Sequence, residues 1–204
     1  MPRACFTELL IRVNDRIKNG IDRWMFLPGM LFDSPDKWWG KRGRRAAPHE
    51  GLDLCLYRDS IGRIQGLDNK TRIPVMYDGK IVAVVSDFIG KSVIVEHKDC
   101  DSESPGFCSI YAHTRPAADL QIGHIVKQGE VLATIAGSDR SKSGIRPHLH
   151  LSLALTNKYI SYERFNWQTI GSRDTLKLLD PLVVFDRPYQ VLKNINLDAA
   201  GDKL

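Results

Sequence analysis

The sequence lacks an apolar run long enough to cross a membrane. Its longest run is Trp24 to Phe32, nine residues interrupted by Pro28 and Gly29, whereas a membrane helix needs about 20 apolar residues. The N-terminal residues do not combine a basic segment, an apolar stretch and a small-residue cleavage site, so we expect no export signal. Internal repeats and low-complexity tracts are also missing, which argues against fibrous and repeat architectures.

Cysteine is scarce as well. The four cysteines are Cys5, Cys55, Cys100 and Cys108, and no C-x-x-C occurs, so a zinc cage built from cysteines is not expected. Cys55 lies in an apolar strand, where a small packing residue is favoured over a metal ligand. Cys100 and Cys108 share one loop, and the sequence leaves open whether they are bridged or free.

What remains is the composition of an ordinary globular protein. The chain has 204 residues, of which 43% are hydrophobic and 26% charged, and a chain of this length buries roughly 70% of its unfolded surface. It therefore needs no metal merely to fold, and a metal found here should be functional. The net charge is +5, and five basic residues fall within nine positions without an acid between them: Lys37, Lys41, Arg42, Arg44 and Arg45. This run favours a solvated basic loop over an anion-contacting patch.

The hydrophobic pattern changes along the chain and predicts three parts. Residues 6–17 carry an amphipathic helical stripe that Asn19-Gly20 should end. Residues 28–48 show neither the helical nor the strand period. We therefore expect an N-terminal helix and basic arm at residues 1–45, a β-domain with a C-terminal extension at residues 46–190, and a tail at residues 191–204.

After residue 46 the sequence consists of short β-branched runs separated by glycine turns. This texture predicts a mainly β fold, an antiparallel sheet or sandwich preceded by the N-terminal amphipathic helix and arm. The expected strands are Leu52 to Tyr57, Ile81 to Val85, Ser92 to His97, Ser109 to His113, Val131 to Ile135 and His148 to Leu155. The polar connections at 58–72, 98–108, 137–147 and 156–175 are long enough to form the walls of a site. Near the end of the chain, Asp180-Pro181 predicts a helix start.

The first motif with chemical content is His49-Glu50-Gly51-Leu52-Asp53. An extended chain puts His49, Gly51 and Asp53 on one face, so that a nitrogen and an oxygen ligand converge. Gly51 has no side chain and is expected to leave room between them for an ion and its water. Taken alone, the pattern is also typical of the start of an ordinary strand.

Two further motifs carry histidines on strands. His148-Leu149-His150 opens an apolar strand, and alternation sends both imidazoles to one face, although hydrogen-bonded core histidines are the alternative for an isolated H-x-H. Tyr111-Ala112-His113 closes another strand with Tyr111 and His113 on the same face. His97 and His124 have no partner at ligand spacing and are interpreted as polar residues at strand ends and turns.

Together the motifs supply two histidines and a carboxylate that could hold zinc and leave a fourth position for water, as in catalytic zinc sites. If His49, Asp53 and His150 are the ligands, His148 lies one strand period from His150 and close to the reacting water. His113 would then be a further neighbour. Because zinc lowers the pKa of its water to roughly 7, a neutral imidazole would be a suitable base.

In their order along the chain, these motifs resemble those of the lysostaphin-type zinc metallopeptidases, which cut peptide cross-links or stems in bacterial cell walls. That family carries H-x-G-x-D, then D-G-K-V, then Y-x-H, then a glycine-spaced G-x-x-V-x-x-G-x-x-I stretch, and finally P-H-L-H. The corresponding segments here are His49 to Asp53, Asp78 to Val82, Tyr111 to His113, Gly123 to Ala136 and Pro147 to His150. The resemblance covers roughly residues 45 to 155.

The resemblance implies an antiparallel β-domain with an open groove, Zn²⁺ held by His49, Asp53 and His150, and catalytic roles for His113 and His148. The implied function is that of a zinc-dependent metalloendopeptidase that hydrolyses peptide bonds of bacterial cell-wall peptidoglycan. It also implies a location outside the cytoplasm, periplasmic or secreted, although no export signal is visible.

The chain departs from the family pattern in two places. It has the polar insertion at residues 58–72, and residues 141–146 stand where the family more often has a turn rich in Gly, Ser and Thr. Substrate preference is therefore open.

Two other classes of function are also open. A non-catalytic module on the same fold would bind wall polymer or another protein through the groove and the basic arm. A histidine phosphocarrier of the sugar phosphotransferase type uses a related fold and two neighbouring histidines, but Asp53 would repel a phosphohistidine and help to bind a cation. Nucleic acid is not an expected partner, because no recognised module surrounds Trp38 and Trp39.

Overall fold

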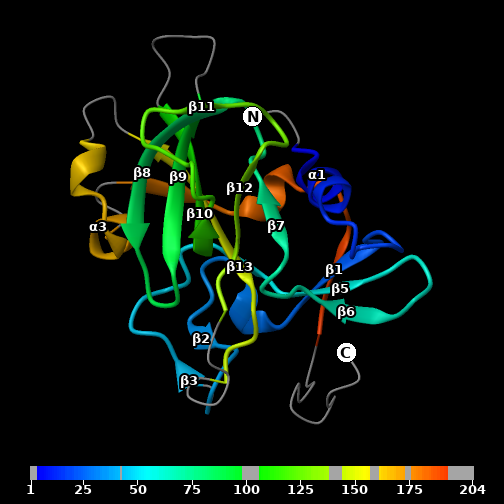
Figure 1. The fold of residues 1–204 in the computed structure, drawn as a ribbon. Coiled ribbons are helices and arrows are strands. Elements are labelled where there is room, and N and C mark those ends of the chain that lie inside the picture. The colour runs from blue at the N-terminus through cyan, green and yellow to red at the C-terminus, as the bar shows by residue number, and fades with distance from the viewer. Residues whose placement is uncertain are drawn as a thin grey trace.

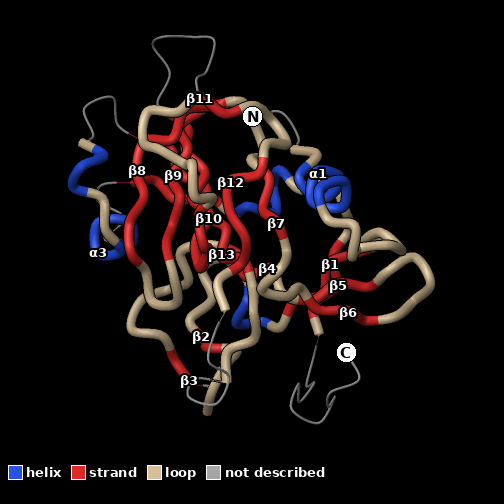
Figure 2. Tube along the Cα trace, viewed as in Figure 1, coloured by secondary structure: helices blue, strands red, loops and turns tan. Residues whose placement is uncertain are grey.

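The computed structural model describes residues 4–41, 43–97, 106–137, 144–156, 161–172 and 176–192. Over these residues the fold is mainly antiparallel β, with short helices at its margins (Figures 1 and 2). No helix in these ranges is both long enough and apolar enough to cross a membrane. The expected fold class is confirmed.

The large sheet forms the centre of the molecule. Its strands follow the order β11-β8-β9-β10-β12-β7, and β13 pairs with β10, β14 and β4. The bounds are β4 (Leu52–Leu54), β7 (Arg72–Pro74), β8 (Gly79–Ser86), β9 (Lys91–His97), β10 (Gly106–Pro116), β11 (Ile125–Val126), β12 (Val131–Ile135), β13 (Leu149–Thr156) and β14 (Leu176–Leu179). All of these pairings are antiparallel.

Strand β10 changes its neighbour partway along its length. It pairs with β13 as far as Ala112 and with β12 from Thr114 onward. On its other edge, the register with β9 shifts between Tyr111 and Thr114. His113 lies at this irregularity and has a φ of 60°. Bulges of this kind redirect side chains, so His113 does not follow the simple alternation of its strand.

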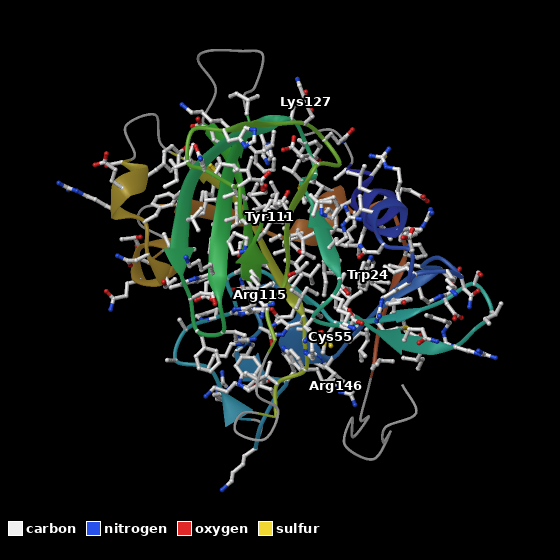
Figure 3. All side chains as sticks on the ribbon, in the orientation of Figure 1. Trp24, Cys55, Tyr111, Arg115, Lys127 and Arg146 are labelled. Carbon is white, nitrogen blue, oxygen red and sulfur yellow. The ribbon has the colours of Figure 1, made fainter. Side chains whose placement is uncertain are left out.

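A second sheet of four strands lies beside the first. Its order is β15 (Tyr189–Val191), β1 (Arg23–Phe26), β5 (Leu56–Arg58) and β6 (Ile64–Gly66). The single strand expected from Leu52 to Tyr57 is therefore wrong, because β4 joins the large sheet and β5 joins this one. Cys55 is the residue between β4 and β5, where the chain passes from one sheet to the other (Figure 3). It is buried in the core, as expected of a small packing residue.

The N-terminal helix is shorter than its sequence pattern predicts. Helix α1 (Phe6–Val13) ends four residues before the expected end of the 6–17 stripe. The side chain of Asn14 donates to the carbonyl of Leu10 and to that of Arg72, both at 2.8 Å, and accepts from the Arg72 N–H at 2.7 Å. These side-chain bonds compete with continuation of the helix and fasten its end to β7.

The arm and the C-terminal part contain short elements only. The arm holds the 3₁₀ turn Pro28–Met30 and the hairpin of β2 (Asp36–Lys37) and β3 (Gly43–Arg44), which lies at the lower edge of the ribbon in Figure 1. The later elements are the 3₁₀ turns Tyr162–Arg164 and Pro181–Val184 and helix α3 (Trp167–Gly171). The helix start expected at Asp180-Pro181 is present as a 3₁₀ turn, where Asp180 accepts from the Leu182 N–H at 2.9 Å.

One continuous core joins helix α1 and the two larger sheets. Phe6, Trp24 and Tyr111 are fully buried members of it, and Tyr111 lies at the centre of the large sheet in Figure 3. Cys108 is buried and has a free thiol, so it is not bridged. Cys100 lies outside the described residues, as do most of the tail and parts of the polar connections after β9, β12 and β13.

Candidate metal centre

Two of the expected ligands are brought together by sheet register. Asp53 in β4 lies directly opposite His150 in β13, and directly opposed residues of antiparallel strands share one face with Cβ atoms about 4.5–5.5 Å apart. The Oδ1 atom of Asp53 is 2.9 Å from Nδ1 of His150. The pairing of β4 with β13 is therefore what builds this half of the centre.

The third residue, His49, comes from the loop before β4. Its N–H donates to the carbonyl of Ser34 at 3.0 Å, and its own carbonyl accepts from Asp33 at 2.9 Å. Its Nε2 atom lies 3.2 Å from Oδ1 of Asp53 and 3.1 Å from Nδ1 of His150. The exposed fractions of His49, Asp53 and His150 are 0%, 2% and 4%, so these donor atoms form a buried triangle.

The second nitrogen of each imidazole in the triangle has its own partner. His49 Nδ1 lies 2.9 Å from the carbonyl oxygen of Leu31, which only accepts, so Nδ1 carries the hydrogen and Nε2 presents a lone pair. His150 Nε2 lies 2.9 Å from the hydroxyl oxygen of Ser152. When it donates there, Nδ1 also presents a lone pair. Metal-bound histidines usually donate their other N–H to an oxygen in this way.

These residues fit a zinc ion. Two nitrogen lone pairs and a carboxylate oxygen repel one another unless a proton or a cation lies between them. Donor atoms bound to tetrahedral zinc at about 2.0–2.1 Å lie about 3.3 Å apart, close to the observed edges of 3.2, 3.1 and 2.9 Å. In the described part of the chain, the side chains of His49, Asp53 and His150 form a group that could bind one metal ion, and their donor atoms lie within 4.8 Å of one another.

The remaining oxygen of Asp53 is held away from the triangle. Trp38 Nε1 donates to Oδ2 at 2.7 Å, and Arg45 Nη2 lies 3.5 Å from the same atom. Burial alone would raise the pKa of the Asp53 carboxyl, but the facing imidazoles of His49 and His148, together with hydrogen bonds from the histidines, outweigh it and hold the pKa well below its ordinary value. Asp53 is therefore an ionised candidate ligand with Oδ1 directed at the histidines.

The basic run of the arm divides into surface residues and one residue of the site. Three of its members are exposed, as a solvated loop predicts: Lys37, Lys41 and Arg44. Arg45 instead stacks 4.5 Å from the centre of the Trp39 ring and donates to the carbonyl of Gly29 at 3.0 Å. Arg42 lies outside the described residues. The sequence of the basic run contains no feature that distinguishes Arg45 from the other four basic residues.

His148 and His113 lie beside the triangle, with ring centres 4.9 Å apart. His148 Nδ1 donates to the carbonyl of Arg146 at 2.9 Å, so Nε2 carries a lone pair, 3.7 Å from Oδ1 of Asp53. Burial lowers the pKa of His148 to about 4. His113 is more open, with 15% of its side chain exposed, and its Nδ1 lies 3.1 Å from Oδ1 of Asp87.

A cavity of about 410 Å³ opens over this group. Asp53, His113, His148 and His150 line it, and its walls are aromatic and aliphatic, with Trp39, Phe88, Ile89, Ile145 and Trp167. The ring of Trp167 lies 5.2 Å from that of His150. The cavity therefore opens onto the candidate ligands between largely apolar walls.

The expectation for Gly51 is wrong. A Cβ atom there would lie 2.3 Å from the carbonyl oxygen of Leu151 and 2.8 Å from Nε2 of His150. The backbone of β13 therefore fills the space that was expected to hold an ion and its water. Gly51 instead lets β4 approach β13 closely enough for Asp53 and His150 to pair.

The histidines that were expected to lie outside the site do so. His97 is buried, with Nδ1 2.9 Å from the carbonyl of Asp78 and Nε2 2.7 Å from the hydroxyl of Ser109. It ends strand β9, as expected, and is a hydrogen-bonded core histidine. His124 is exposed.

Sequence reasoning missed several residues of the site. Ser152 could have been found, because it lies two positions after His150 on the same strand face. Asp87 and Trp167 gave no such signal, because they lie far along the chain from their partners His113 and His150.

One segment of the chain matches a known protein family. Residues 62–162 match the model of peptidase family M23. The matched segment includes His113, His148 and His150 and begins after His49 and Asp53, which the fold brings next to them. No curated protein sequence matches the chain.

The solved structures that are similar to the chain include the following two. The NMR solution structure of lysostaphin is 17% identical, with a TM-score of 0.43, over 72% of this chain and 47% of that one. A mutant of the catalytic domain of the prophage-encoded M23 protein EnpA from Enterococcus faecalis is 21% identical, with a TM-score of 0.40, over 69% of this chain and 98% of that one. The chain thus spans about half the length of lysostaphin.

Proposed function

We propose that this chain, which carries a domain of peptidase family M23, is a zinc-dependent endopeptidase that hydrolyses peptide bonds of bacterial cell-wall peptidoglycan. The observation that supports this most strongly is the buried triangle of His49, Asp53 and His150, in which each imidazole has its second nitrogen next to another oxygen. The substrate implies that the chain acts outside the cytoplasm, periplasmic or secreted. Residues 46–190 would be its catalytic domain.

His49 Nε2, Asp53 Oδ1 and His150 Nδ1 would hold the zinc. When bound, zinc supplies a Lewis acid that lowers the pKa of water to about 7 and polarises the scissile carbonyl. Trp38 and Arg45 act on this centre indirectly, because both contact Oδ2 of Asp53, the carboxylate oxygen that does not face the histidines. They fix the orientation of the carboxylate.

His113 and His148 act on the attacking water. Each has its Nδ1 engaged, by Asp87 and by the Arg146 carbonyl respectively, so each offers an Nε2 lone pair. A water molecule between the two rings can donate one hydrogen to Nε2 of each. In that orientation a lone pair of the water oxygen points at the substrate carbonyl. Orientation of this kind is a large part of catalysis by positioned groups.

The proton of the attacking water passes to His113 rather than to His148. Burial disfavours charge on His148, whereas the ring of His113 is more open and has Oδ1 of Asp87 3.1 Å from its Nδ1. As the C–O bond forms, Nε2 of His113 accepts the proton. It then gives the same proton to the amide nitrogen as the C–N bond breaks, which releases a carboxylic acid and an amine. The acid's remaining proton then passes to the amine, so that the final products are a carboxylate and an ammonium group.

The phosphocarrier alternative has less support. Oδ1 of Asp53 lies within 3.2 Å of ring nitrogens of both His49 and His150. A phosphoryl group on either nitrogen would meet this carboxylate at close range, and like charges so placed repel strongly.

The test is digestion of isolated peptidoglycan. The purified chain should release new amino and carboxyl termini that mass spectrometry of the fragments assigns to one type of peptide bond. A His150→Ala variant should release none, and a His124→Ala variant, which changes an exposed histidine, should match the parent. If the zinc-loaded parent binds peptidoglycan and releases no new termini, the chain is a binding module and the proposal fails.

A further inference from the structure

Asp87 lies in the turn between β8 and β9, next to the site, and its carboxylate is almost completely enclosed, with a side-chain exposure of 1%. Oδ1 accepts from the N–H groups of Ile89 at 2.9 Å and Gly90 at 2.7 Å, and Oδ2 accepts from the hydroxyl of Ser92 at 2.7 Å. These bonds hold the carboxylate in one orientation within the turn.

The same carboxylate contacts His113 twice. Oδ2 accepts from the backbone N–H of His113 at 2.8 Å, and Oδ1 lies 3.1 Å from its Nδ1. His113 has a φ of 60° where β10 changes partner, a conformation that costs a non-glycine residue energy and persists only when its surroundings impose it. Asp87 thus stabilises both the backbone and the ring of His113.

The ionisation state of Asp87 matches this geometry. Burial alone would raise the pKa of its carboxyl, but hydrogen bonds from His113 and from backbone N–H groups outweigh burial and hold the pKa well below the ordinary value. An ionised carboxylate only accepts hydrogen bonds. The hydrogen of a neutral His113 ring must therefore be on Nδ1.

We infer that Asp87 is a positioning residue of the site, which fixes the tautomer and orientation of His113 so that the Nε2 lone pair faces the cavity. The inference rests on the proposed function, in which that lone pair takes the proton of the attacking water. Without Asp87 the ring would adopt the Nε2–H tautomer that an unconstrained imidazole prefers, and it would present a donor to the water instead of an acceptor.

A second contact ties Asp87 to the wall of the cavity. Trp167 Nε1 donates to the hydroxyl of Ser92 at 3.1 Å, and Ser92 in turn donates to Asp87. The wall residue and the histidine therefore share one carboxylate. His148 offers an internal reference, because its Nδ1 is held by a backbone carbonyl, which no side-chain substitution at Asp87 removes.

The experiment is nitrogen NMR of the imidazole rings in the chelator-treated protein, at a pH where they are neutral. In the parent, His113 should carry its hydrogen on Nδ1. In Asp87→Ala it should change to the Nε2–H tautomer while His148 keeps its own. The zinc-loaded variant should retain stoichiometric zinc and a KM within about threefold of the parent, and kcat should fall by about 10²- to 10⁴-fold.

Asp59→Ala is the matched control. Asp59 also accepts two backbone N–H bonds in a hairpin turn, from Ile61 at 3.2 Å and Arg63 at 2.8 Å, far from His113 in the sequence and outside the cavity lining. Its loss should lower stability without changing the His113 tautomer or kcat.

Two results would overturn the inference: an Nε2–H tautomer of His113 in the parent, or an unchanged tautomer in folded Asp87→Ala. The first needs no variant, so the inference is testable even if Asp87→Ala does not fold. Because the spectra require neither zinc nor activity, an inactive parent with the expected tautomers would count against the proposed function alone.

Discussion

Replacing Gly51 with alanine should damage the candidate metal centre although it changes none of the candidate ligand residues. The added Cβ would lie 2.3 Å from the carbonyl oxygen of Leu151, a distance that real Cβ atoms essentially never show. To reach even 3.0 Å, β4 and β13 must separate by about 0.7 Å, and this pairing is the one that sets Asp53 opposite His150. A metal site tolerates only about 0.2 Å in its ligand distances.

The magnitude follows from these distances. Overpacking against backbone typically costs about 1–3 kcal/mol of folding stability. We expect the metal-free Gly51→Ala protein to lose stability within that range. Its affinity for zinc should fall at least about tenfold, which corresponds to about 1.4 kcal/mol, because the three donor atoms no longer converge.

Urea denaturation of the metal-free proteins and competition titration with a chromophoric zinc chelator measure the two effects. Gly66→Ala is the matched control, because Gly66 ends a strand and a Cβ there would meet nothing closer than 3.8 Å. It should leave zinc affinity unchanged and stabilise the fold by up to about 1 kcal/mol through the unfolded state. If Gly51→Ala binds zinc as tightly as Gly66→Ala, the account of the β4 and β13 approach is wrong.

Three further predictions address the groups around the ligands. His113→Ala and His148→Ala should each keep stoichiometric zinc by elemental analysis while kcat falls about 10²- to 10⁴-fold; loss of zinc would make that histidine a ligand. Trp38→Phe removes the 2.7 Å donor to Asp53 and should weaken zinc binding about 10- to 100-fold in the competition titration, and unchanged affinity would show that Trp38 only packs. Burial lowers the pKa of His97, so its imidazole binds a proton more readily in the unfolded chain than in the folded one. The free energy of unfolding of the metal-free parent should therefore be highest above about pH 6.5 and fall below it. Urea denaturation should show a smaller pH dependence in His97→Gln.

The fold class and the candidate site residues could be predicted because the sequence pattern carries them directly. Alternation placed His148 and His150 on one face, and the glycine turns separated β8 from β9. The order of the motifs along the chain then supplied the candidate ligand set. What alternation could not predict was register, and register is what sets Asp53 opposite His150.

The misses share a physical cause, which is contact between residues distant in the sequence. The strand is divided at Cys55 because the residues before it pair with the large sheet and the residues after it pair with the four-stranded sheet. The early end of α1 depends on Asn14 reaching Arg72. Asp87 and His113 are 26 residues apart, and the role of Gly51 depends on the backbone of a strand about 100 residues later. No local pattern contains these contacts.

The central claim is that hydrolysis depends on one zinc ion held by His49, Asp53 and His150. The most direct test is to titrate zinc into the chelator-treated parent while measuring the release of new amino termini from isolated peptidoglycan. The account predicts that activity rises from zero in proportion to added zinc and levels off at one equivalent, and that Asp53→Ala stays inactive throughout. Cleavage without zinc, or a parent that binds one equivalent and still releases no termini, would contradict it.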